Sequence, residues 1–452
     1  MLSEVVDENF QEALTRGSKL ILSNDYVRVL AHYDGDGTSA AIILATALER
    51  KGIKYHLGYI KSLDGDSFRK RLEEEKDVFT VIVDAGSDQA QYISDFGNVV
   101  ILDHHFYTKS TVACLNINAR DYGVDGTREA CGATMAYLMA LAIDEDNKDL
   151  LPFFLSGVIA DKQDIGGLEG LNRKIMDVYG KGATSTRMLN FEGQNLLDSI
   201  TYSTDPFFLD LSGYPENVRK FLSDLGIDPA KKFIDVTEDQ KRELAANLAI
   251  RMLSQKVGTE ALKYLESDIV SFKGTEFTSK EISSIVDGNS KMGMNSLSVQ
   301  YFLGDDSVKE ELISNWKIFK TKLIDYIYRA LKDTYNESNV RYFYAPESEM
   351  AGSISGIMML YLLDQEKPLV GFSVNTENTK VSGRGTRKMV AKGLNLSVIM
   401  KECSREVGGN GGGHDIAAGA VIPRGSEKQF VTLVNKMVGE QLTGTKVQTK
   451  KI

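Results

Sequence analysis

Short apolar runs alternate with helical patterns over the first 180 residues, and this alternation constrains the fold more than any other feature. Runs with the length and β-branched content of buried strands lie at 26–31, 55–60, 78–83 and 99–102. The first run leads into a polar turn at 34–37 and a small-residue helix from Thr38 to Lys51, which Gly52 ends. Further core helices are expected at 129–142 and 150–160. This pattern predicts an α/β fold with a parallel sheet covered by helices.

The chain of 452 residues is too long for one ordinary core, so several domains are expected. We predict an α/β domain over 1–190, a largely helical insertion over 191–335, a smaller C-terminal α/β domain over 336–445, and a polar tail at 446–452. The longest helix of the insertion is expected near 308–332, where apolar residues recur every three or four positions. Strand patterns return at 340–345 and 368–374.

Composition and charge limit the classes of function. The sequence has no uninterrupted apolar run of membrane-spanning length and no apolar leader, so we expect a cytoplasmic protein without membrane contact. The formal net charge of −10 disfavours non-specific coating of duplex DNA, although a local basic groove remains compatible with it. The three cysteines lie far apart in the sequence, so any metal has to be held by Asp, Glu and His.

Acidic and histidine residues follow three of the predicted strands. His32, Asp34 and Asp36 follow the first strand, Asp84 the third, and Asp103, His104 and His105 the fourth. In an open parallel sheet, ligands bind outside the carboxyl ends of the strands, so these side chains can converge although they are distant in sequence. Asp161 and Asp164 follow a core helix and would share one face if that segment is helical. We therefore predict one site built from several strand ends.

Carboxylates at this density repel one another unless cations neutralise them, so the pattern predicts a metal centre. Oxygen and imidazole ligands without thiolate suit Mn²⁺ or Mg²⁺ better than a structural zinc ion. Two ions about 3.5 to 4 Å apart would activate water and stabilise the leaving oxygen during in-line attack on phosphorus. The alternative to a metal centre is that residues 34–37 are only a polar turn and residues 103–105 only a chance surface cluster. This alternative requires such features to occur by chance at the ends of several strands.

A second candidate site is the glycine-rich segment at 408–414, which precedes a short Ala-rich stretch. Glycines permit positive φ, so successive N–H groups can point at an anion, and a following helical turn would add its positive end. Ser382 and Arg384 lie nearby in the sequence, and an arginine can grip a phosphate through two N–H groups. We predict a phosphate or nucleotide cradle; the alternatives are a flexible loop and a solvated arginine.

The segments HYDGDG, VDAGS, DHH and GVIADKQD resemble, in this order, motifs I to IV of the DHH phosphoesterase superfamily. This superfamily includes RecJ-type exonucleases, oligoribonuclease/pAp phosphatases and family II pyrophosphatases. The segment GGGHDIAAGA resembles the signature of the DHH-associated domain, and Ser382–Arg384 resembles its Ser-x-Arg-Ser element, with Gly385 where a second Ser is common. The resemblance implies a parallel-sheet DHH domain, a smaller C-terminal DHH-associated α/β domain, and metal-dependent hydrolysis of phosphodiester bonds.

Carried over residue by residue, the resemblance implies a centre of two ions, Mn²⁺ or Mg²⁺. Asp34 would ligate one ion and Asp36 the other, Asp84 would bridge them, and His104 and Asp161 would complete the second site. His105 would contact phosphate or assist proton transfer, with Asp103 orienting the pair. His32 stands two residues before the first Asp, where several relatives have a histidine four before it, which leaves its contact with metal or substrate open. Asp164 has no counterpart. The expected substrate-binding residues are Ser382, Arg384, Gly411, Gly412, Gly413 and His414.

The long region between the two domains resembles the inserted domain of archaeal RecJ-like nucleases that bind the GINS replication complex. We therefore predict a single-strand-specific exonuclease, 5′ to 3′ on DNA, that releases nucleoside monophosphates in DNA replication or repair. Its expected partners are single-stranded DNA or RNA and GINS. The alternatives are an oligoribonuclease/pAp phosphatase, a catalytically inactive subunit of the replicative helicase, and a pyrophosphatase. An inactive subunit is expected to lose metal ligands, and a pyrophosphatase has no use for the glycine-rich segment.

Overall fold

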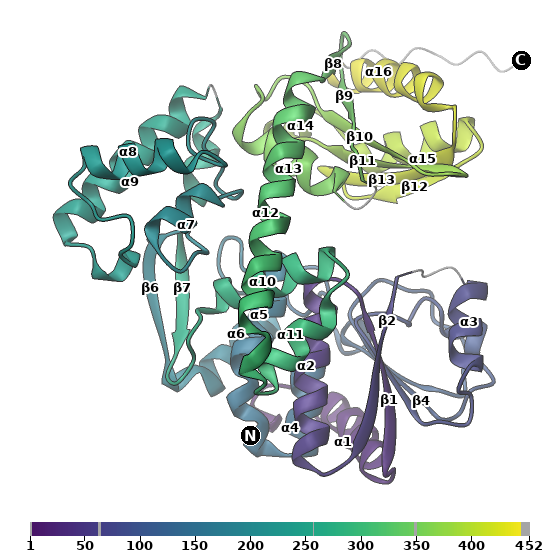
Figure 1. Cartoon of the computed structure of the whole chain (residues 1–452). Coiled ribbons are helices and arrows are strands. Elements are labelled where there is room, and N and C mark those ends of the chain that lie inside the picture. The colour runs from purple at the N-terminus through teal and green to yellow at the C-terminus, as the bar shows by residue number, and fades with distance from the viewer. Residues whose placement is uncertain (1, 62–64, 256, 348–349, 444–452) are drawn as a thin grey trace, which may run out of the picture. The chain divides into compact units, whose positions relative to one another are not determined.

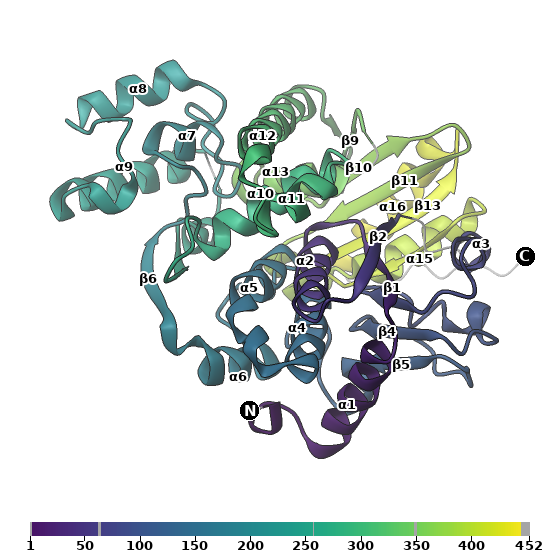
Figure 2. The same cartoon turned by 60° about the horizontal axis from the view of Figure 1, so that its bottom comes forward.

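The computed structural model describes residues 2–61, 65–255, 257–347 and 350–443 (Figures 1 and 2). The chain separates into an N-terminal unit, Met1–Thr186 with Asp268–Phe319, and a C-terminal unit, Arg187–Ser267 with Lys320–Ile452. The segment predicted as an insertion is therefore divided, because residues 268–319 pack with the N-terminal unit. Among the described residues, no helix is long and apolar enough to cross a membrane.

A five-stranded parallel sheet forms the centre of the N-terminal unit and confirms the predicted α/β architecture. Its order is β2-β1-β3-β4-β5, with β1 at Tyr26–His32, β2 at Lys54–Ile60, β3 at Thr80–Val83, β4 at Val99–Asp103 and β5 at Leu115–Asn118. Strand β2 lies on one side of β1 in the sheet, and β3 lies on the other side of β1. The switch in strand order thus lies between β1 and β3, where a ligand site is expected at the carboxyl ends.

Alternate residues of the strands face two apolar cores. One core includes Val29 and Val81 and is built with α1 (Glu8–Leu22), α2 (Gly35–Arg50), α4 (Gly132–Ile143) and α5 (Leu151–Ala160). The other core includes Leu30 and Ile82 and is built with α3 (Gly65–Glu73). Helix α6 (Gly170–Tyr179) follows α5, and α10 (Ser279–Lys291) and α11 (Asn295–Phe302) belong to the same unit. Helix α10 packs on α2 and α5.

Helix α2 begins earlier than predicted, and the polar turn expected at 34–37 is its first turn. Asp34 is the N-cap, and its Oδ1 accepts a hydrogen bond of 3.0 Å from the backbone N–H of Gly37. A carboxylate that satisfies a free N–H at a helix start favours helix over loop, even for a glycine-rich sequence. The predicted end is confirmed, because Gly52 has a φ of 70°, in the left-handed region.

The C-terminal unit contains a six-stranded mixed sheet of order β12-β13-β11-β10-β9-β8. Its strands are β8 (Tyr335–Asn336), β9 (Arg341–Tyr344), β10 (Leu369–Val374), β11 (Asn378–Arg384), β12 (Asn410–Gly413) and β13 (Ala417–Pro423). Its helices are α7 (Leu196–Thr201), α8 (Pro215–Asp224), α9 (Glu238–Ser254), α13 (Ala351–Tyr361), α14 (Arg387–Ala391), α15 (Leu396–Glu406) and α16 (Glu427–Thr443). The predicted long helix is α12 (Lys309–Lys332), which continues from one unit into the other, as do the paired strands β6 (Ala183–Leu189) and β7 (Glu266–Phe272).

The glycine-rich segment is not a loop followed by a helical turn, as expected, but a β-hairpin. Strands β12 and β13 are antiparallel, with Gly411 opposite Ala420. A Cβ on Gly411 would lie 2.6 Å from the carbonyl oxygen of Met400 in α15, and one on Gly409 would lie 2.2 Å from that of Val421. The glycines here allow close approach of backbone segments rather than loop mobility.

Candidate functional site

The end of β1 and the start of α2 carry the first three candidate residues. His32 is the last residue of β1, Asp34 is the N-cap of α2, and Asp36 is buried in its first turn. The carboxylate of Asp36 accepts hydrogen bonds from the N–H groups of Gly132 (2.6 Å) and Ala133 (2.9 Å), the first residues of α4. The positive end of α4 therefore fixes the orientation of this carboxylate.

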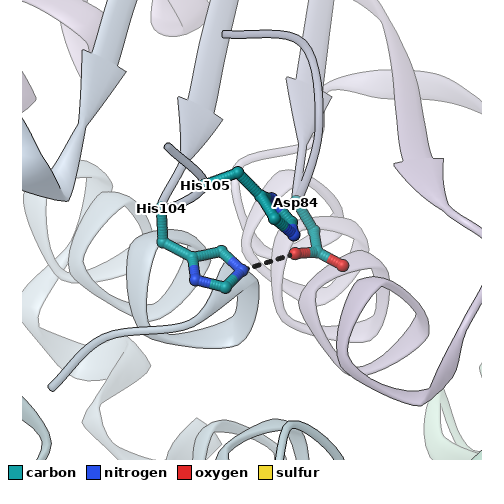
Figure 3. A group of neighbouring side chains, drawn as sticks. All are labelled: Asp84, His104 and His105. Atoms are coloured by element: carbon teal, nitrogen blue, oxygen red, sulfur yellow. Dashed lines mark hydrogen bonds and ion pairs between the residues drawn. The ribbon is translucent and has the colours of Figure 1, made fainter. Parts of the chain in front are cut away.

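Asp84 directly follows β3 and lies at the centre of the site. Its φ of 62° is in the left-handed region, which non-glycine residues seldom adopt. Its Oδ1 lies 3.1 Å from Nε2 of His104 (Figure 3), and its Oδ2 lies 3.5 Å from Nδ1 of His32. A Cβ on Gly132 would stand 2.3 Å from Cβ of Asp84, so a glycine at the start of α4 is needed for this approach.

The Asp103-His104-His105 segment is held by a network of short contacts. Buried Asp103 accepts hydrogen bonds from the N–H groups of His104 (2.8 Å) and Ser87 (2.9 Å), and its Oδ1 lies 2.8 Å from Nδ1 of His105. Nδ1 of His104 lies 2.6 Å from the carbonyl oxygen of Gly126, which can only accept a hydrogen bond. Nδ1 of His104 is therefore the protonated nitrogen, and Nε2 is left to face Asp84.

Asp161 lies in the turn after α5, so the segment with Asp164 is not helical and the condition for the two to share a helix face is not met. Helix α5 ends at Ala160, with Asp161 as its C-cap and Lys162 next at a φ of 59°, in the left-handed region where helices commonly end. The carboxylate of Asp161 accepts a 2.7 Å hydrogen bond from Nε2 of Gln163.

Six residues form two sets of possible metal ligands, and within each set the three ligand atoms lie within 4.8 Å of one another. One set is His32, Asp34 and Asp84, and the other is Asp36, His104 and Asp161. His105 forms a third such set with Asp84 and His104. All residues predicted for the metal centre are thus brought together, apart from Asp103, which supports the histidines. Asp164, the candidate without a counterpart in the family, belongs to none of these sets among the described residues.

The electrostatics of the site favour bound cations. Burial, followed by the neighbouring carboxylate of Asp84, raises the pKa of Asp36 well above its usual value. Burial likewise raises the pKa of Asp161 to about 6. Burial alone would also raise the pKa of Asp84, but the hydrogen bond with His104 and the nearby ring of His32 outweigh it and lower this pKa. A cation would relieve the repulsion among these carboxylates.

His32 supplies a direct test of whether the residues fit a metal ion. Its Nδ1 is buried and lacks a hydrogen-bond partner within the described part of the chain, although it lies 3.0 Å from Oδ2 of Asp34. A buried ring nitrogen without a hydrogen bond is costly unless something else satisfies it. The available donors are carboxylate oxygens and imidazole nitrogens without thiolate, which fit Mn²⁺ or Mg²⁺.

The C-terminal unit holds Ser382, Arg384 and Gly412 on one face of its sheet, whereas Gly411 and Gly413 alternate with Gly412 and lie on the other face. Ser382 in β11 is in register with Gly419, and Gly419 with Gly412, so the three lie in one row across β11, β13 and β12. Apart from its chain neighbours, no described atom lies within 4 Å of the position that a Cβ of Gly412 would take, so the sheet has an open floor at this one position. Burial lowers the pKa of Arg384, which lies two residues beyond Ser382 and has no acidic partner among the described residues. His414 lies in the exposed turn after β12.

Two family models match the chain: the N-terminal domain of the DHH family over residues 26–159, and the DHHA1 domain over residues 339–440. An uncharacterized protein of Methanocaldococcus jannaschii is 30% identical over 456 residues, which cover 94% of this chain and 96% of that protein. The chain belongs to the DHH family. The matches confirm the resemblance drawn from the motifs, with a DHH domain before and an associated domain after the central region.

Solved structures share the fold of this DHH protein at low sequence identity. RecJ of Thermus thermophilus, in complex with Mn²⁺, has a TM-score of 0.60 at 15% identity and covers 96% of this chain. This chain spans only 55% of that RecJ chain. CDC45 of Entamoeba histolytica has a TM-score of 0.58 at 11% identity, covering 92% of this chain and 95% of its own. An exonuclease RecJ bound to manganese has a TM-score of 0.53 at 16% identity, covering 97% of each chain.

Several residues of the DHH site were not found by sequence reasoning. Gln163, buried beside the centre, donates to Asp161 and to the carbonyl oxygen of Ala130 (2.8 Å). Gly132 gives α4 its close approach to Asp84, and Ser87 supports Asp103. Gln163 and Ser87 stand inside the quoted motifs GVIADKQD and VDAGS, and that position is the signal that could have identified them.

Proposed function

We propose that this DHH protein is a metal-dependent, single-strand-specific exonuclease of the RecJ type, acting 5′ to 3′ on DNA and releasing nucleoside monophosphates in replication or repair. The proposal rests on two adjacent sets of possible metal ligands, which meet where Asp84 of one set contacts His104 of the other. Such paired sets suit the two-ion hydrolysis of phosphodiesters.

The two sets divide the ligands between two ions. His32, Asp34 and Asp84 would hold one, and Asp36, His104 and Asp161 the other. Mn²⁺ or Mg²⁺, when bound, would neutralise the carboxylates and polarise a phosphoryl oxygen. The hydrogen bonds of Asp36 to α4 and of His104 to Gly126 hold these side chains in place before substrate binds.

His105 is the residue proposed to move a proton. Burial alone would lower the pKa of His105, but the hydrogen bond with Asp103 outweighs it and raises this pKa, which favours the protonated ring. A ring nitrogen of His105 lies within 4.8 Å of the ligand atoms of Asp84 and His104. The imidazole can therefore contact the scissile phosphate and donate a proton to the leaving oxygen.

The C-terminal unit is proposed to bind the end of the strand. Arg384 and Ser382 offer donors for a terminal phosphate, and the open floor at Gly412 leaves room for the adjoining sugar and base. A binding point for a strand end favours exonucleolytic cutting over internal cutting. His414 would contribute from the neighbouring turn.

Two alternatives follow from the same family. An oligoribonuclease/pAp phosphatase would use the same ligands on shorter substrates, and it remains the second candidate. An inactive subunit of the replicative helicase is disfavoured because Asp34, Asp36, Asp84, His104 and Asp161 are all present and brought together.

A digestion series tests the proposal. Single-stranded DNA and RNA of several lengths, labelled at either end, are incubated with the protein and Mn²⁺. Mononucleotides released progressively from the 5′ end of DNA support the proposal. Preference for di- to tetranucleotides of RNA would favour the oligoribonuclease alternative, and absence of hydrolysis with any metal would favour the inactive subunit.

We also propose that the segment containing α7, α8 and α9 contacts a protein partner, for which GINS is the candidate. Ile234 and Ile250 in this segment are 72% and 64% exposed, and Leu253 is 45% exposed. Exposed apolar side chains on neighbouring elements are a feature of protein interaction surfaces.

A further inference from the structure

Tyr33 lies between two residues of the metal centre, and two lysines approach its ring. The Tyr33 ring packs edge-on against that of His32, with the centroids 5.0 Å apart. Nζ of Lys61, which follows β2, lies 5.6 Å from the Tyr33 centroid, and Nζ of Lys291, which ends α10, lies 5.4 Å from it. Cation–π contacts of this length hold an ammonium group near an aromatic ring. Two positive charges are thus held beside a centre rich in carboxylates.

The corner between α10 and α11 is tied to the turn that carries the metal ligands. The side-chain amide of Asn295 donates to the carbonyl oxygen of Tyr33 (2.7 Å) and to Oγ1 of Thr38 (2.8 Å). Oγ1 of Thr38 also lies 3.0 Å from Oγ of Ser290, next to Lys291. Asn295 and Ser290 are buried, so these bonds fix the position of the corner.

This corner lies outside both family matches, which end at residue 159 and begin at residue 339. It nevertheless belongs to the same compact unit as the metal centre. Helix α10 packs on α2 and α5, and its last residue is Lys291, so the helix delivers this lysine to the turn that follows β1. A part of the chain that neither family match covers therefore contributes a charged side chain next to the site.

We propose that Tyr33, Lys61 and Lys291 form a second phosphate-binding site, which holds the phosphate next to the scissile one in a single-stranded nucleic acid. This inference rests on the proposed phosphodiesterase function and names a subsite for its substrate. The carboxylates of the centre repel every phosphate that the ions do not neutralise. Lysine ammonium groups act as point charges for phosphate, and two of them offset that repulsion.

The site predicts that substrates with a second phosphate are preferred. The test compares the full-length protein with the variants Lys61→Ala, Lys291→Ala and the double variant. Lys54→Ala is the matched control, because Lys54 is an exposed lysine at the opposite end of the same strand, more than about 20 Å away at the usual rise per residue. Each protein is assayed with Mn²⁺ on an oligonucleotide and on the same oligonucleotide with a neutral methylphosphonate at the neighbouring position.

For the wild type and Lys54→Ala, the methylphosphonate should lower kcat/KM about tenfold, as expected for loss of one charge-assisted contact. In the double variant, kcat/KM on the normal oligonucleotide should fall by a similar factor, and the methylphosphonate should then change it by less than about twofold. Each single variant should also reduce the salt dependence of oligonucleotide binding by about one unit of log–log slope.

Equal sensitivity to the methylphosphonate in the wild type and the double variant would overturn this proposal while leaving the exonuclease function intact. If the wild type cleaves no nucleic acid, the exonuclease function fails. The salt dependence of oligonucleotide binding, measured by fluorescence anisotropy, then still decides the lysine site: an unchanged slope in both single variants rejects it.

Discussion

Nε2 of His104 lies 3.1 Å from Oδ1 of Asp84, and this contact joins the two sets of candidate ligands (Figure 3). Asp84 belongs to the set with His32 and Asp34, and His104 to the set with Asp36 and Asp161. The two residues come from the ends of adjacent strands, β3 and β4, so the sheet itself sets their separation. Any change at Asp84 should therefore affect both halves of the centre.

Asp84→Asn should lower hydrolysis on the order of a thousandfold, the scale seen when one key electrostatic group is removed. Asparagine is the appropriate replacement because it tolerates the left-handed φ of 62°, whereas most side chains would add backbone strain. Mn²⁺ binding, measured by calorimetry, should weaken as well. The control is Asp95→Asn, which alters an exposed carboxylate paired with Arg69. If Asp84→Asn retains wild-type turnover, the proposal that Asp84 is a metal ligand is rejected.

Metal affinity should rise with pH between about 5 and 7. Burial raises the pKa of Asp161 to about 6, above the value near 3.9 of an unfolded chain, so ion binding must displace its proton. Between pH of about 4 and about 6, Asp161 holds more of its proton in the folded, metal-free protein than in the unfolded chain, so the stability that this carboxyl contributes falls as pH rises through that window.

Thermal unfolding with EDTA or with Mn²⁺ measures both effects. The increase in Tm caused by Mn²⁺ should be larger at pH 7 than at pH 5. In Asp161→Asn, the metal-free protein should lose less stability over the same pH range, because the titrating carboxyl is gone. An Mn²⁺ effect on Tm that is independent of pH would contradict the raised pKa of Asp161.

The sheet and most of the candidate metal centre could be predicted from the sequence because their signals are local. Apolar runs of strand length end in acidic or histidine residues, and parallel strands bring those ends to one edge. Strand β5 was missed because its sequence, LNIN, alternates polar and apolar residues over only four positions.

Long-range packing could not be predicted in the same way. Asn295 and Tyr33 are 262 positions apart in the sequence, and no local pattern in α11 indicates that Asn295 forms a hydrogen bond with the turn that carries the candidate ligands. The glycine-rich segment was misassigned because glycine serves both mobile loops and close backbone contacts. The pairing of β12 with β13 and the position of Met400 beside Gly411, both long-range contacts, distinguish the two uses here.

Neighbouring glycines of β12 should respond to substitution in opposite ways. Gly411→Ala places a Cβ 2.6 Å from a backbone oxygen of α15 and should lower the free energy of unfolding by about 1 to 3 kcal/mol. Gly412→Val faces the open floor and should change stability by less than about 0.5 kcal/mol, because a valine suits a strand. It should raise KM about tenfold by filling the space for a nucleotide, equivalent to about 1.4 kcal/mol of binding. Denaturant unfolding and steady-state kinetics separate the two effects, and an unchanged KM in Gly412→Val would reject the nucleotide floor.

Ile250→Asp on α9 should abolish binding of GINS without changing hydrolysis of oligonucleotides. Ile250 is 64% exposed, so the substitution removes apolar contact area at little cost to folding, while a buried charge in an interface is strongly unfavourable. Val398→Asp is the matched control, since Val398 in α15 of the same unit is 44% exposed and lies outside α7–α9. Surface plasmon resonance with purified GINS compares the two variants with the wild type. If the wild type and Ile250→Asp bind GINS equally, the GINS contact does not include Ile250. If the wild type does not bind GINS, the proposal that GINS is the partner of this segment is rejected.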